Sequence, residues 1–305
     1  MRELDVRAQD FDLRMTLNSG QVFHWEKVGA GFCGAIGDRA AYVEQRGNSL
    51  RAKVEDGVLR SRRNKGPGRM AGSLTAATAA QLVQNYFALD HRLGEICESF
   101  PSDPLMNSAR EFCSGLRIIR QPKWECLATF ICSSMKQVAH IRQISRGLRQ
   151  RFGEKKQIDE HEVFSFPSAA RLARKSETEL LQCGLGYRAK NLLATAKRID
   201  SGEADLNSWS TLSDGELRER LCQLPGVGIK IANCAMLFAY ERIAAFPIDV
   251  WIERVLRQNY LARRRTVTGQ IMAEFAADHF GRYGGYAQQY LFHHARMTRK
   301  RGDNK

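Results

Sequence analysis

The hydrophobic pattern of this chain changes once along its length, and that change limits the possible folds more than any other feature. Between residues 11 and 59, short apolar stretches alternate with glycines and turn residues, as in residues 32–36 (FCGAI). This pattern is typical of short antiparallel strands joined by tight turns. The first part of the chain is therefore predicted to form an antiparallel β-meander.

From about Ala76 onward, apolar residues recur at helical spacing. Val138 and Ile141, for example, begin a run whose apolar side chains share one face while arginines occupy the others. We therefore expect an α+β fold, with an N-terminal antiparallel β-sheet domain in residues 1–105 and a mainly α-helical region in residues 106–305.

Composition and charge restrict the class of protein. The 305 residues are 43% hydrophobic and carry a net charge of +14, with a sequence pI near 9.6. Such an excess favours a polyanionic partner, although a basic protein without one is the simpler alternative. No apolar run approaches the roughly 20 residues that span a bilayer, and the first ten residues are too charged for a secretory signal. We therefore expect an intracellular protein without a membrane segment.

The cysteines suggest neither a disulfide framework nor a metal site. All eight are scattered, none forms a C-x-x-C pair, and the seven histidines show no H-E-x-x-H spacing. We therefore expect no metal.

The most informative segment is residues 224–234 (LPGVGIKIANC), which follows a predicted capping box at residues 213–216. Gly226 and Gly228 permit a tight turn between two helices. The backbone N–H groups at such a turn and at the start of the next helix can hold a DNA phosphate. An ordinary helical hairpin would use the same turn residues.

Lys230 lies in the first turn of the helix after this hairpin, where a cation opposes the helix dipole. A residue placed against the local preference suggests a functional role, and the role that an amine can take here is that of a nucleophile. Cys234 follows four residues later and shares its face. The simpler alternatives are a surface lysine or a phosphate contact for Lys230 and a small core residue for Cys234.

Asp249 precedes another helical pattern and is predicted to be its N-cap. Backbone hydrogen bonds at a cap favour the ionised carboxylate. An ionised carboxylate beside an aromatic pocket can stabilise positive charge on a sugar as a glycosidic bond breaks. A purely structural cap is the alternative.

The hairpin with Lys230, followed by Asp249, resembles the helix-hairpin-helix DNA glycosylase superfamily, and more specifically the 8-oxoguanine DNA glycosylases. The resemblance runs from about residue 11 to residue 296 and implies a helix-hairpin-helix motif at about residues 213–240. The iron-sulfur branch of the superfamily carries a cysteine cluster after the aspartate, whereas this chain has no cysteine after Cys234. Further matching segments occur in the same order, at residues 19–25 (SGQVFHW), 130–134 (FICSS), 184–189 (GLGYRA) and 286–292 (YAQQYLF).

The resemblance implies specific roles for the base pocket. Gln288 would bind the Watson–Crick edge of a base turned out of the duplex, and Phe292 and Cys234 would hold its two faces. The carbonyl of Gly20 would accept the N7–H that 8-oxoguanine has and guanine lacks, and Tyr187 would fill the gap in the base stack. Taken singly, these residues could equally be core aromatics, a solvated glutamine and a hairpin glycine.

Several residues depart from the family pattern where the family contacts the partner base, which is left unpaired once the damaged base has turned out of the duplex. Met135, Lys136 and Gln137 stand where animal relatives have asparagines, and His140 stands where they have arginine. Trp251 replaces a histidine beside the aspartate. We expect these residues to contact DNA, with weaker selection of the partner base.

The resemblance implies a bifunctional glycosylase and AP lyase in base excision repair, with Lys230 as nucleophile and Asp249 as catalytic carboxylate. Its partner would be double-stranded DNA containing oxidised guanine, it would need no cofactor, and we expect a monomer associated with DNA in the nucleoid or nucleus. A monofunctional glycosylase for alkylated bases would generally lack the lysine. A noncatalytic DNA-binding module would need neither residue.

Overall fold

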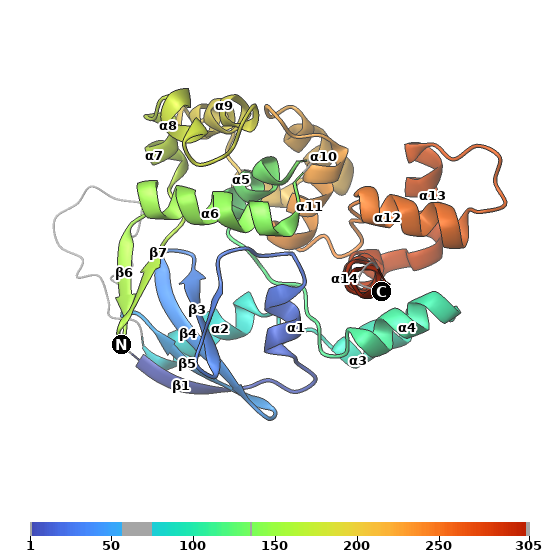
Figure 1. The fold of residues 1–305 in the computed structure, drawn as a ribbon, viewed down its shortest axis with the longest axis horizontal. Helices are drawn as coiled ribbons and strands as arrows, with labels where there is room; N and C mark the ends of the chain where they lie inside the picture. Colours follow the sequence, from blue (N-terminus) through green and yellow to red (C-terminus); the bar gives the residue numbers. More distant parts are fainter. Residues whose placement is uncertain (1, 57–74, 135, 303–305) are drawn as a thin grey trace.

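The computed structural model describes residues 2–56, 75–134 and 136–302 (Figure 1). Residues 60–68 (RSRRNKGPG), a basic stretch rich in turn residues, and Met135 therefore lie outside the described residues. The strands are β1 (Arg2–Arg7), β2 (Glu26–Val28), β3 (Gly31–Ile36), β4 (Arg39–Arg46), β5 (Ser49–Val54), β6 (Lys155–Ile158) and β7 (His161–Phe164). The α-helices are α1 (Leu13–Asn18), α2 (Ala76–Tyr86), α3 (Leu93–Glu98), α4 (Pro104–Phe112), α5 (Lys123–Ser133), α6 (Val138–Phe152), α7 (Ala169–Ala173), α8 (Glu177–Leu181), α9 (Arg188–Asp200), α10 (Asp214–Cys222), α11 (Ile229–Ala239), α12 (Val250–Val255), α13 (Gly269–Phe280) and α14 (Gly284–Gly302). Short 3₁₀ turns η1 (Ser208–Thr211) and η3 (Gly281–Tyr283) and a π-helical turn η2 (Leu256–Tyr260) join them.

The N-terminal strands form a five-stranded antiparallel sheet in the order β1-β5-β4-β3-β2. Strands β2 to β5 are consecutive neighbours, which confirms the predicted meander. The pattern did not predict β1, which pairs with β5 at the sheet edge so that Leu4 faces Ala52. Nor did it predict α1, which Asp12 caps by accepting a hydrogen bond from the Met15 N–H.

Both faces of the sheet are covered, which explains why every residue of β3 is buried. Val83 of α2 and Phe87, the C-cap of that helix, pack on one face. The β6–β7 hairpin packs Ile158 and Val163 against Ala35 on the other face. This hairpin lies within the region predicted to be mainly helical. It packs against the N-terminal sheet and so connects the two regions.

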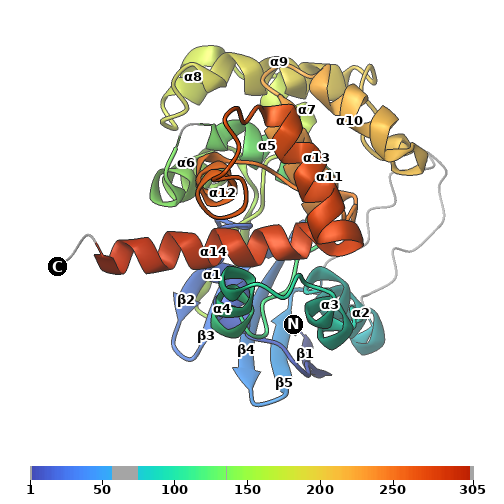
Figure 2. The same ribbon diagram turned by 90° about the vertical axis from the view of Figure 1, so that its right-hand side faces the viewer.

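The remaining helices share one large core that extends from α3 to α14. Figure 2 shows α14 running between the sheet and the upper helices, α5 to α13. Tyr286 and Tyr290 of α14 are fully buried, and the Tyr290 hydroxyl donates to the Leu116 carbonyl at 3.0 Å. Helix α14 therefore contacts both layers, and residues on it can complete a site that lies between them.

The model confirms the predicted α+β architecture, with an antiparallel sheet followed by a mainly helical region. Residues 296–305 are rich in Lys and Arg, yet α14 continues to Gly302 and Arg296 is only 8% exposed. Among the described residues, no helix is long and apolar enough to cross a membrane.

Candidate active site

The predicted hairpin is present, formed by α10, the turn and α11. The capping box that starts α10 is complete, since Ser213 and Glu216 bond each other's backbone N–H. The two turn glycines differ in what they allow. Gly226 has a φ of +78°, and a methyl group there would lie 2.7 Å from Asn191 Cβ, so the turn requires glycine. At Gly228, the N-cap of α11, a methyl group would meet nothing within 4 Å. The backbone at Gly228 is thus open to an approaching phosphate.

Lys230 lies in the first turn of α11, as predicted, and its amine is directed at α5. Its Nζ donates to Ser133 Oγ at 3.3 Å and lies 5.5 Å from the centroid of the Phe130 ring. Ser133 Oγ itself donates to the Phe130 carbonyl, which leaves its lone pairs for the lysine. The amine is therefore held by one polar and one aromatic contact rather than by a carboxylate.

Asp249 is the N-cap of α12, as predicted. Its Oδ1 accepts from the backbone N–H groups of Trp251 at 3.1 Å and Ile252 at 2.9 Å. These bonds favour the ionised carboxylate, as expected, but burial acts against them. Burial raises the pKa of Asp249, and the cap bonds and the positive charge of Lys230 only partly oppose that shift. The result is a carboxylate that can also take up a proton.

Cys234 lies one turn after Lys230 and is buried between the two charged groups. Burial raises the pKa of its thiol to about 11, with Lys230 lowering it and Asp249 raising it. The thiol therefore stays protonated at neutral pH and cannot act as a thiolate nucleophile. Among these three residues, the lysine is the available nucleophile.

Three of the predicted base-contacting residues gather around α14. Gly20 has a φ of +93°, and a methyl group there would lie 3.1 Å from Phe292 Cε1. Gln288 lies one turn before Phe292, is 4% exposed, and has no hydrogen-bond partner for Oε1 among the described residues. A buried amide oxygen without a partner is costly in a folded protein. The edge of a bound base would satisfy it.

The turn that carries Gly20 is fixed by buried side-chain amides. Gln21 Nε2 donates to the carbonyls of Thr16 and Arg117, at 3.2 and 2.8 Å. Gln289 Nε2 donates from α14 to the Ser19 carbonyl at 3.2 Å. The turn that carries Gly20 is thereby bonded both to the Arg117 segment and to α14, the helix that carries Phe292.

Tyr187 projects from the surface, as a residue that enters a base stack must. It immediately precedes α9 and is 61% exposed. The Arg188 guanidinium lies 4.3 Å from its ring centroid, and Arg188 Nε donates to the Ser134 carbonyl at 2.7 Å. This arginine links the tyrosine to the segment that leads into α6.

Lys136, Gln137 and His140 are all exposed at the start of α6. Gln137 is the N-cap of α6 but makes no side-chain capping bond. Its amide is therefore free to contact another molecule, which is compatible with the predicted position beside the partner base.

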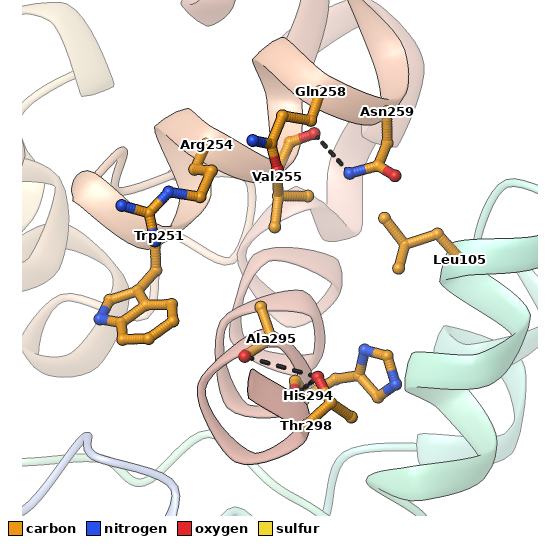
Figure 3. Close-up of a pocket in the computed structure, with 9 residues that line it drawn as sticks. All are labelled: Leu105, Trp251, Arg254, Val255, Gln258, Asn259, His294, Ala295 and Thr298. Atoms are coloured by element: carbon orange, nitrogen blue, oxygen red, sulfur yellow. Dashed lines mark hydrogen bonds between the residues drawn. The ribbon is translucent and has the colours of Figure 1, made fainter. Parts of the chain in front are cut away.

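Trp251 lies at the edge of a hollow of about 190 Å³ between α4, α12 and α14. Figure 3 shows its indole on the opposite side of this hollow from Leu105. The Arg254 guanidinium lies 5.6 Å from the Trp251 ring centroid. Within the described ranges, no group of three or more His, Cys, Asp or Glu side chains is placed to hold a metal ion.

Comparison with known proteins agrees with this geometry. Residues 3–127 match the model of the 8-oxoguanine DNA glycosylase N-terminal domain, and residues 128–277 match that of the HhH-GPD superfamily of base excision DNA repair proteins. N-glycosylase/DNA lyase OGG1 of Arabidopsis thaliana is 31% identical over 312 residues, which cover 95% of this chain and 78% of the relative. The chain belongs to the 8-oxoguanine DNA glycosylase family.

Solved structures from the family share the whole fold. MBOgg1, in complex with a low-affinity DNA ligand, superposes with a TM-score of 0.86 at 30% identity, covering 97% of this chain and 96% of the other. The 8-oxoguanine glycosylase/lyase of Clostridium acetobutylicum, bound to DNA with cytosine opposite 8-oxoG, has a TM-score of 0.83 at 27% identity, with 97% and 98% covered.

The sequence interpretation missed several residues that support this family's site. Phe130 and Ser133 contact the lysine, and Arg188 holds the exposed tyrosine. All three lie in segments that carry the resemblance, so their positions were a usable signal. Arg296 was also missed, although it follows Phe292 by one helical turn.

Proposed function

We propose that this chain excises 8-oxoguanine from duplex DNA and then cleaves the strand, as a bifunctional glycosylase and AP lyase. One observation carries the proposal: Lys230, in the first turn of α11, lies close enough to Asp249, the N-cap of α12, for its positive charge to lower the pKa of that buried carboxyl. A nucleophile beside a carboxylate is what cleavage of a glycosidic bond through a covalent intermediate requires.

Base recognition would precede the chemistry. A damaged base inside a duplex is out of reach, so the nucleotide must turn out of the stack at a cost of a few kcal/mol. Tyr187, exposed and backed by Arg188, would fill the gap. The base would then enter the pocket at Gly20, Phe292 and Gln288, where the Gly20 carbonyl accepts N7–H and the Gln288 amide binds the Watson–Crick edge.

In the first chemical step, the Lys230 amine would form a bond to C1′ of the sugar while the C1′–N9 bond breaks and its electron pair leaves with the base. The Asp249 carboxylate would stabilise the positive charge that develops on the sugar. Loss of the amine proton and opening of the sugar ring give a Schiff base. Its imine acidifies the C2′ proton, so removal of that proton expels the 3′ phosphate by β-elimination.

The protonation states of the site fit this sequence of steps. Lys230 bonds a neutral hydroxyl rather than a carboxylate, so its amine is not fixed in a salt bridge. The buried Asp249, with its raised pKa, can take up a proton and return it. Both properties favour a bifunctional enzyme over a noncatalytic DNA-binding module.

Borohydride trapping tests the proposal. A duplex containing 8-oxoguanine opposite cytosine should give a covalent protein–DNA adduct, because borohydride reduces the imine. Lys230→Gln should abolish the adduct and retain duplex binding. Lys197→Gln removes an exposed lysine of α9 and serves as the matched control. An undiminished adduct in Lys230→Gln would refute the assignment.

A duplex that contains oxidised guanine would be the partner, and the net charge of +14 favours binding to its phosphates. The site draws all its predicted residues from one chain, so we expect a monomer to suffice. The protein would act where the cell keeps its DNA, in a nucleoid or a nucleus.

A further inference from the structure

The guanidinium of Arg296 lies beside the predicted base pocket, and no part of the mechanism above uses it. A methyl group on Gly20 would lie only 2.5 Å from Arg296 Nη1. The guanidinium carbon is 5.2 Å from the centroid of the Phe292 ring. Arg296 thus contacts the two residues that are predicted to read one edge and one face of the base.

Only some of the N–H donors of the Arg296 guanidinium have a hydrogen-bond partner among the described residues. Its Nη2 donates to the Asn18 carbonyl at 2.7 Å and lies 3.2 Å from His293 Nδ1. Its Nη1 is buried and has no partner among the described residues, although Nη2 of the same guanidinium is held by these two contacts. Burial and the nearby Arg142 lower the pKa of Arg296 to about 10, so it remains a cation at neutral pH. An unpartnered buried cationic donor requires an acceptor.

We propose that Arg296 is a specificity-determining residue that donates a hydrogen bond from Nη1 to the C8 carbonyl oxygen of 8-oxoguanine. This inference rests on the proposed function. Oxidation gives the base two adjacent new groups, an N7–H donor and a C8=O acceptor. The pocket offers a matching adjacent pair, the Gly20 carbonyl and the Arg296 guanidinium. Guanine has a bare N7 and a C8–H, so it matches neither.

A substrate that alters only the C8 acceptor tests the contact. In 8-thioguanine the N7–H remains, while sulfur replaces the oxygen and accepts hydrogen bonds weakly. Single-turnover excision of each base, opposite cytosine, is compared for the full chain and for Arg296→Met. The variant should excise 8-oxoguanine about ten- to a hundredfold more slowly, the range for a lost hydrogen bond to a charged group, and 8-thioguanine nearly as fast as before. The ratio of the 8-oxoguanine rate to the 8-thioguanine rate should therefore fall about ten- to a hundredfold in the variant.

Controls separate this role from a structural one. Arg142→Met removes the other arginine that bonds Asn18, at 3.0 Å from Oδ1, and should leave the ratio unchanged. Trapping of Arg296→Met on a preformed abasic site needs no base and should be unaffected. Arg296→Lys keeps the charge and should give an intermediate ratio, which also decides the matter if the methionine variant folds poorly.

The two possible failures are distinguishable. If the unaltered chain does not excise 8-oxoguanine, the proposed function itself fails. If it does, and Arg296→Met slows both bases by the same factor, then Arg296 only supports the Gly20 turn and the inference is overturned.

Discussion

Lys230 Nζ and Ser133 Oγ lie 3.3 Å apart and join the first turn of α11 to the last turn of α5. Because the Ser133 hydroxyl donates to the Phe130 carbonyl at 2.7 Å, its remaining capacity is as an acceptor. The contact therefore orients the amine without a permanent counter-charge. In the proposed mechanism, an amine held in this way would approach C1′ of the sugar from a defined direction.

Ser133→Ala should slow single-turnover excision of 8-oxoguanine about three- to tenfold, the range for one lost hydrogen bond. Borohydride trapping should persist, since the amine itself remains. Ser133→Thr keeps the hydroxyl and should recover most of the rate. An alanine variant as fast as the unaltered chain would show that the serine is only a packing residue.

Asp249→Asn should reduce excision by about a hundredfold or more, because an amide cannot stabilise the cationic sugar. The fold should persist, since the asparagine oxygen can accept the same two backbone bonds. In the unaltered chain, excision should decline as acid protonates Asp249, with an inflection above the ordinary 3.8 because burial raises its pKa. Unchanged excision in the variant would reduce Asp249 to a structural cap.

Gly20→Ala should abolish most excision of 8-oxoguanine, because the added methyl group would lie 2.5 Å from Arg296 Nη1 and 3.1 Å from Phe292 Cε1. Gly37→Ala is a matched control, since Gly37 also has a positive φ but open space around it. Both variants should lose roughly 1–2 kcal/mol of stability from backbone strain. Equal excision by the two would remove Gly20 from the base pocket.

Selection of the partner base should be modest. The Lys136, Gln137 and His140 side chains are exposed and offer long or flexible contacts in place of the family's asparagines and arginine. Each lost matched contact would remove roughly 1–3 kcal/mol of discrimination. Single-turnover excision opposite each of the four bases measures it. A cytosine preference of several orders of magnitude would show that these residues read cytosine.

Stability should fall as the pH drops from about 6.5 toward 4. His293 is 3% exposed and burial lowers its pKa to about 4, while the unfolded chain has the ordinary value of 6.5. The unfolded state therefore binds protons first in this window, and folding loses at most about 3 kcal/mol from this residue. Urea unfolding at several pH values should show a flatter profile for His293→Gln. Identical profiles would exclude His293 as a cause.

The sequence predicted the order of layers, the hairpin and the Asp249 cap because each depends on local signals. Glycine placement, capping residues and hydrophobic spacing act over a few residues, and the structure has the capping box and the Asp249 cap where expected. The β6–β7 hairpin was missed because its strands are short and are stabilised by Ala35 and its neighbours, far away in the sequence.

The electrostatic character of the site could not be predicted from local pattern. The raised pKa of Asp249 comes from burial, which depends on the packing of several helices. Arg296 lies in a stretch rich in Lys and Arg, which by itself indicates an exposed segment, whereas its burial depends on Asn18 and Gly20 at the other end of the chain. Such contacts are set by topology rather than by neighbours in the sequence.

The bond from Gln289 to the Ser19 carbonyl joins residues 270 positions apart. Because the ribosome makes the N-terminus first, the Gly20 turn must wait for almost the whole chain before it meets Phe292. A chain that ends before α14 would contain the hairpin and Lys230 but would lack the residues that fix the Gly20 turn. In the proposed function, recognition of the damaged base would therefore depend on contacts that form only after α14 has been synthesised.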